Sequence, residues 1–174
     1  MNEKVINMHL RGMDHKGNAF VAGIYPLCID ETCGFLAIDF DKGEWQKEIK
    51  VLREVCVELG IPLAIERSRS GNGAHAWFFF EESISATQAR KFGSALITHC
   101  MTKRHEIPFK SYDRLFPNQD IMPKGGFGNL IALPLQKAAR NENNSIFIDE
   151  NFEPIDDQWA YLSNIKKLSE DEVK

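Results

Sequence analysis

Apolar runs and amphipathic stretches alternate along the first two thirds of the chain. Residues 18–25 and 34–40 are rich in aromatic and β-branched side chains and are bounded by Gly, Pro and Asp, which predicts two strands. Residues 44–59 carry apolar side chains at steps of three and four and are followed by Gly60 and Pro62, which predicts an amphipathic helix. A second helix is expected over 85–103, where Ser85 and Gln88 have the spacing of a capping box.

The remaining segments complete an α+β pattern. Residues 62–67 and 74–80 predict two strands joined by a turn, and residues 106–128 predict an irregular Gly/Pro-rich segment. Strands are expected at 129–133 and 145–148, and a short helix at 158–165. This order is typical of helices packed on a mostly antiparallel sheet. We expect a single domain over residues 1–174, and we interpret the charged end, KKLSEDEVK, as the sign of a fragment of a longer multidomain protein.

Composition excludes several classes of protein. With 43% hydrophobic and 26% charged residues, the chain is not collagen-like, of low complexity or largely disordered. No apolar run is long enough to cross a membrane, and the N-terminus lacks the apolar core of a signal peptide, so a cytoplasmic location without a membrane partner is expected. The four cysteines lack framework spacing. Cys28 and Cys33 form a C-x4-C pair without a second pair, so structural zinc is disfavoured.

Charge is unevenly distributed along the chain. The net charge of −4 argues against a nucleic-acid partner. Residues 101–140, however, contain seven Lys and Arg against three Asp and Glu, a local net charge of +4. This stretch is a candidate for facing an anion, and a solvated charged loop is the alternative.

An acidic pair ends the apolar run FLAIDFD. Asp39 and Asp41 alternate with Phe40, so they lie on one face of the predicted strand, about 6.6 Å apart at Cα. Two carboxylates at this distance repel each other unless a cation lies between them, which favours a site for Mg²⁺ or Mn²⁺. The alternative is an acidic strand end followed by a helix N-terminus. An EF-hand is excluded, because its twelfth position would be Lys50.

A turn between two strands is the second feature. Ser70, Gly71, Asn72 and Gly73 can turn backbone N–H groups towards an anion, His75 opens the next strand, and Arg69 adds positive charge. Asn-Gly between strands is also an ordinary hairpin pattern. A metal site and a phosphate-binding turn together are what a metal-nucleotide complex requires, and this combination favours the functional interpretation.

The third feature is the segment 110–136. It contains Asp113 and Asp120, either of which can supply a third carboxylate to a two-metal site, and a PKGGFGN loop with Lys124. This loop is not a P-loop, because no Gly-Lys-Ser/Thr follows the glycines.

In this order, the three features resemble the archaeo-eukaryotic primase superfamily, also called primase-polymerases. The matching motifs are Asp39-Phe40-Asp41, the SGNGAH turn ending at His75, and Tyr112-Asp113. Over residues 16–168 the chain is most similar to the primase domain of the TOTE conflict systems of prokaryotes. One departure is Gly73, because the superfamily often has Ser two residues before the His.

The resemblance implies a fold and an activity. The fold is an RRM-like antiparallel sheet fronted by an N-terminal α/β unit, with the active site in the cleft between them. The activity is template-dependent nucleotidyl transfer from NTPs or dNTPs on single-stranded DNA or a primer-template, in a conflict, defence or replication system. Partner helicase or nuclease domains in the same polypeptide or operon are implied as well.

The resemblance also implies roles for particular residues. Asp39, Asp41 and Asp113, with Asp120 as the alternative third ligand, would bind two Mg²⁺ or Mn²⁺ ions and no organic cofactor. His75 would contact the phosphates of the nucleotide. Arg69, Ser70 and Lys124 would lie near the triphosphate.

Three alternatives stay open from the sequence. A haloacid-dehalogenase-type phosphatase would use Asp39 as nucleophile, but Lys42 follows the pair and the strand content fits a doubly wound fold poorly. A catalytically silent module would bind single strands on sheet aromatics. A two-metal nuclease would share the acidic cluster without using the turn.

Overall fold

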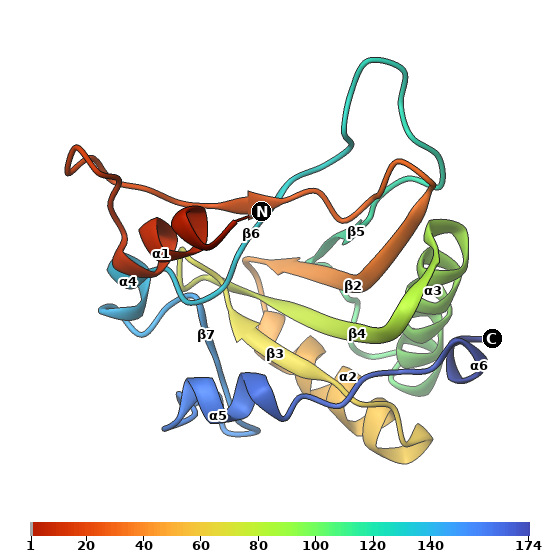
Figure 1. The fold of residues 1–174 in the computed structure, drawn as a ribbon. Helices are drawn as coiled ribbons and strands as arrows, with labels where there is room; N and C mark the ends of the chain where they lie inside the picture. Colours follow the sequence, from red (N-terminus) through yellow and green to blue (C-terminus); the bar gives the residue numbers. More distant parts are fainter. Residues whose placement is uncertain (1) are drawn as a thin grey trace.

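A five-stranded antiparallel sheet forms the centre of the computed structural model, which describes residues 2–174 (Figure 1). Its strands, in chain order, are β2 (Thr32–Asp41), β3 (Ala64–Arg67), β4 (Gly73–Ser85), β5 (Tyr112–Phe116) and β7 (Ile146–Phe147). They lie in the order β5-β2-β4-β3-β7, and every neighbouring pair is antiparallel. The expected α+β class is confirmed, and the parallel doubly wound sheet that the phosphatase alternative needs is absent from residues 2–174.

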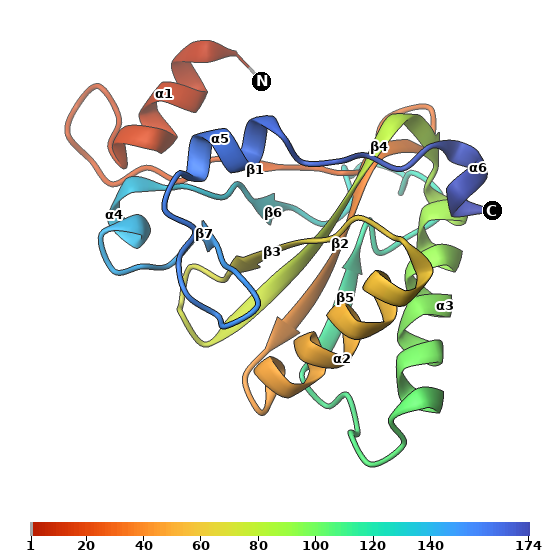
Figure 2. The same cartoon turned by 90° about the horizontal axis from the view of Figure 1, so that it is seen from below.

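Two long helices cover one face of this sheet. They are α2 (Trp45–Leu59) and α3 (Ala86–Lys103), and both were expected from the sequence. Alternate side chains of β2, such as Leu36, Ile38 and Phe40, are fully buried against them. In Figure 2, α2 lies below the sheet and α3 to its right, and we call the side opposite these helices the front face.

Shorter elements cover part of the front face (Figure 2). A two-stranded sheet pairs β1 with β6, and α1 contacts α4. An apolar cluster on this side includes Ala37, Trp77 and Phe147, with Tyr161 packed against it. The elements are α1 (Glu3–Arg11), β1 (Gly23–Ile24), β6 (Ile131–Ala132), α4 (Lys137–Arg140) and α5 (Gln158–Ser163).

Several predicted boundaries are wrong. The expected strand at 18–25 is reduced to β1, because this segment crosses the front face and pairs only briefly with β6. The segment 106–128 is not wholly irregular, since it contains β5, whose two adjacent charged residues hide the strand pattern. Helices α1 and α4 were not expected from the sequence.

The charged tail has a closing element that the sequence analysis did not expect. Leu168 is buried and forms a parallel bridge with Phe80 of β4. Ser169 then caps α6 (Glu170–Val173) in a complete capping box with Glu172. At α3, by contrast, only Ser85 caps the helix, and the Gln88 side chain donates to the carbonyl of Glu170.

Candidate active site

The acidic pair lies on the front face at the C-terminal end of β2. Asp39 is in register with His75 of β4 on one side and with Arg114 of β5 on the other. Asp41 is opposite Gly73. The Asp39 side chain is 20% exposed and that of Asp41 47%, so both carboxylates reach solvent from a rigid strand.

A β-bulge brings Asp113 beside this pair. The register between β2 and β5 shifts between Asp39 and Phe40, which oppose Arg114 and Tyr112, so Asp113 is the extra residue. The Asp113 carboxylate accepts a hydrogen bond from Nε of Arg114 at 2.6 Å. Three carboxylates and one guanidinium therefore share the surface of two adjacent strands.

His75 is held between two carboxylates. Its Nε2 lies 3.5 Å from Oδ1 of Asp39, and its Nδ1 lies 2.9 Å from Oε2 of Glu66 on β3. Glu66 is 2% exposed and also accepts hydrogen bonds from Trp77 and Ser145. The His75 ring therefore points along the front face towards Asp39.

The electrostatics follow from this crowding. Burial raises the pKa of Asp39 above its ordinary value, Asp113 and Asp41 raise it further, and His75 and Arg114 oppose the rise. Burial by itself lowers the pKa of His75, but the hydrogen bond and charge of Glu66, together with Asp39 and Asp41, outweigh it and raise the pKa. The site thus concentrates negative charge that a cation would stabilise.

The turn at 68–73 lies directly beside the acidic pair. The amide of Lys42, which follows β2, donates to the carbonyl of Asn72 at 2.8 Å. Two amides that the sequence analysis assigned to an anion are used inside the turn. Gly71 donates to the Ser68 carbonyl at 2.9 Å, and Asn72 donates to Ser70 Oγ at 3.3 Å. The Arg69 and Ser70 side chains are exposed.

Gly73 accounts for the departure from the superfamily motif. A Cβ at this position would lie 2.3 Å from the carbonyl oxygen of Phe40 on the neighbouring strand. The backbones of β2 and β4 are too close here for any side chain at position 73. This position therefore has glycine where the superfamily often has serine.

The two acids of the third feature are placed differently. Asp113 lies in the bulge next to Asp39, whereas Asp120 forms an ion pair with Arg90 of α3. Lys124 is exposed on the loop that follows β5. The amide of Met122 in this loop donates to Glu31 at 3.4 Å, beside the start of β2 and at the opposite end of that strand from the acidic pair. The structure therefore does not bring Lys124 together with Asp39 and Asp41.

The basic stretch 101–140 does not form a continuous surface. Lys103 and Arg104 pair with Glu58 and Glu54 of α2, and Arg114 pairs with Asp113. The Arg140 guanidinium donates to the carbonyl of Leu10. Four of the seven cations of this stretch therefore contact carboxylates or a carbonyl of the protein, which leaves Lys110, Lys124 and Lys137 as its candidates for facing an anion.

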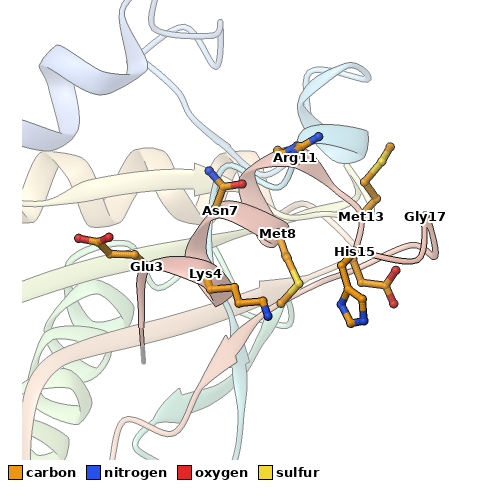
Figure 3. Close-up of a pocket in the computed structure, with 9 residues that line it drawn as sticks. Glu3, Lys4, Asn7, Met8, Arg11, Met13, His15 and Gly17 are labelled. Atoms are coloured by element: carbon orange, nitrogen blue, oxygen red, sulfur yellow. The ribbon is translucent and has the colours of Figure 1, made fainter.

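A hollow of about 700 Å³ lies away from these residues, along α1 and the loop that follows it (Figure 3). It carries side chains of both charges and none from the sheet that holds the acidic pair. Its lining residues are Glu3, Lys4, Asn7, Met8, Arg11, Met13, Asp14, His15 and Gly17.

No three His, Cys, Asp or Glu residues within 2–174 converge on one metal position in this arrangement. The two cysteines of the C-x4-C pair are in different environments, because Cys33 is fully buried and Cys28 is exposed. Burial raises the pKa of the Cys33 thiol to about 12, which disfavours the thiolate that would bind a metal. Across the same residues, no helix combines the length and apolar character needed to cross a bilayer.

Two residues of the site were not expected from the sequence. Glu66 is opposite His75 in the β3–β4 hairpin, and counting outward from the turn would have revealed this pair. Arg114 is opposite Asp39 only because β5 is a strand, and no local pattern predicted that strand.

The chain matches a known protein family over its length. The profile of the family described as "TOTE conflict system, Archaeo-Eukaryotic Primase domain" matches residues 1–174. No curated protein matches the chain at a significant level.

Proposed function

The chain belongs to the archaeo-eukaryotic primase domain family of the TOTE conflict systems, and from this premise we propose that it catalyses template-directed nucleotidyl transfer. The observation that carries the proposal is the grouping of Asp39, Asp41 and Asp113 on two adjacent strands, with His75 beside them. The substrates are an NTP or dNTP and single-stranded DNA or a primer-template. We expect helicase or nuclease domains as partners.

The donor chemistry of the site fits divalent metal. Asp39, Asp41 and Asp113 present only hard oxygen ligands, which Mg²⁺ and Mn²⁺ prefer. The raised pKa of Asp39, caused by burial and by the two neighbouring carboxylates, indicates a charge that a cation would relieve. When bound, two such ions supply activation of a 3′-hydroxyl and neutralisation of the phosphates.

The chain's own residues orient the reactants. Asp39 and Asp41 on β2 and Asp113 on β5 are rigidly positioned by their strands, and together they give this part of the site its negative charge. Nδ1 of His75 is hydrogen-bonded to Glu66. Nε2 is therefore the ring atom that faces the open site and donates to a phosphate oxygen. Arg114 donates to Asp113 at 2.6 Å, and its guanidinium would be the nearest cation for a phosphate if Asp113 held a metal ion.

The turn contributes a smaller part of the phosphate site than the sequence analysis expected. Two of its amides already donate within the turn, so the exposed side chains of Arg69 and Ser70 are its contribution to the triphosphate. We propose Asp113 as the third metal ligand, since Asp120 is paired with Arg90.

The decisive test is nucleotide incorporation on primed and unprimed single-stranded DNA with Mg²⁺ or Mn²⁺. We expect Asp39→Ala/Asp41→Ala to reduce incorporation at least about 100-fold, because it removes two carboxylates that hold the catalytic charge. The melting temperature is expected to stay equal or rise, since the substitution removes repulsion between carboxylates.

A matched control is available on the same sheet. Glu81→Ala/Glu82→Ala removes the same charge from exposed positions near the far end of β4 and is expected to retain wild-type incorporation. Equal activity of the two double variants would contradict the proposal. Incorporation on the primed template alone would identify an extending polymerase that does not initiate.

A further inference from the structure

Glu66 is a buried carboxylate on β3, beside His75 of the candidate active site and on the same face of the sheet. Its side chain is 2% exposed and accepts three hydrogen bonds. His75 Nδ1 at 2.9 Å and Trp77 Nε1 at 3.0 Å both donate to Oε2, and Ser145 Oγ at 3.3 Å donates to Oε1. Such a set of donors satisfies a group whose burial is otherwise costly.

His75 is the only basic side chain within residues 2–174 that forms an ion pair with Glu66. No Lys or Arg from this part of the chain neutralises the carboxylate. A buried charge with a single His partner is more costly than an apolar residue of the same size, so stability alone does not account for a Glu at this position.

The contacts fix the orientation of the His75 ring. A carboxylate accepts hydrogen bonds, so the Nδ1 atom facing Glu66 carries a proton, and Nε2 is directed at Asp39, 3.5 Å away. The Trp77 ring packs edge-on against the imidazole at 6.0 Å and 84°. The imidazole is therefore held by one hydrogen bond and one aromatic contact.

We propose that Glu66 is a positioning residue that acts through His75, a role that rests on the proposed function. Glu66 holds the imidazole with Nε2 towards the acidic site, where it meets the nucleotide phosphates. Glu66 itself touches neither the nucleotide nor the metal ligands. Carboxylates behind functional His residues act in this way in metal sites and catalytic triads.

The first test measures nucleotide incorporation in a double-mutant cycle. We expect Glu66→Ala to raise the KM for nucleotide about 10- to 100-fold, and Glu66→Gln, which keeps an acceptor for Nδ1, to recover part of that loss. The double variant Glu66→Ala/His75→Ala is expected to be no worse than His75→Ala alone, because Glu66 acts only through the ring. Additive losses would overturn the proposal.

The matched control removes another hydrogen bond from the same carboxylate. Ser145→Ala deletes the hydroxyl that donates to Oε1 and leaves the bond to His75 intact, so the nucleotide KM is expected to change less than twofold. A rise in KM as large as that of Glu66→Ala would show a general packing role and would overturn the proposal.

The second test does not depend on catalysis. In ¹⁵N spectra of the His75 ring, recorded without nucleotide, we expect Nδ1 to be protonated in the wild type and in Ser145→Ala, and the ring signals to change in Glu66→Ala. An unchanged ring in Glu66→Ala would overturn the positioning role. If the wild type incorporates no nucleotide while the ring responds as expected, the proposed function has failed and the Glu66–His75 contact has not.

Discussion

Gly73 and Phe40 illustrate how single residues set the shape of the site. The approach of β2 and β4 at Gly73 leaves no room for a Cβ, and the same pair of strands carries Asp39 opposite His75. The turn that precedes Gly73 is tied to β2 by the amide of Lys42. The distance between the acidic pair and His75 therefore depends on the smallest residue of the hairpin.

We expect Gly73→Ala to lower the free energy of unfolding by about 3 kcal/mol, because the added Cβ meets backbone that cannot rotate away. Chemical denaturation measures this change. Gly34→Ala is the control, since a Cβ on Gly34, which lies in the neighbouring strand β2, meets its nearest atom at 3.9 Å. Equal stabilities of the two variants would show that the strands separate at little cost.

At the scale of elements, buried polar side chains hold segments in place around the sheet. Glu48 of α2 accepts a hydrogen bond from the amide of Ser111 at 3.1 Å, just before β5 and Asp113. His9 of α1 is 1% exposed. Its Nδ1 accepts from the amide of Ala22 at 3.0 Å, and its Nε2 donates to the carbonyl of Pro134 at 2.8 Å. The His9 ring thus ties α1 to the segments next to β1 and β6.

We expect His9→Leu to destabilise the α1 region by about 2–4 kcal/mol, because it leaves a buried amide and a part-buried carbonyl without partners. Hydrogen exchange is expected to become faster over residues 3–24 and to stay unchanged in β4. His15→Leu, at an exposed position, serves as control. Uniform acceleration over the whole chain would contradict this local effect.

At the scale of the whole molecule, acidic side chains outnumber basic ones. The net charge is −4, and part of the contiguous basic stretch of the sequence is engaged with α2, with β5 and with the Leu10 carbonyl of α1. Lys110, Lys124 and Lys137 form no ion pair with any residue of 2–174. The excess of negative charge therefore disfavours binding to a phosphate backbone.

We expect this chain to bind single-stranded DNA weakly, with a dissociation constant of about 10 µM or higher at 150 mM salt. With two or three phosphate contacts, the affinity should fall about tenfold between 50 and 200 mM salt. Fluorescence anisotropy with a labelled oligonucleotide measures both values. Submicromolar binding that ignores divalent metal and survives Asp39→Ala/Asp41→Ala would support the silent binding module instead.

The sequence by itself determined the features that depend on local order. Alternation along β2 placed Asp39 and Asp41 on one face, and the periodicity of α2 and α3 predicted two helices and their buried sides. The tertiary structure alone decided which distant groups join the pair. Asp113 and Arg114 lie beside Asp39 because β5 pairs with β2 through a bulge, whereas Asp120 forms an ion pair with Arg90. Strand pairing and loop conformation depend on contacts between residues far apart in the chain, and a local sequence pattern does not predict those contacts.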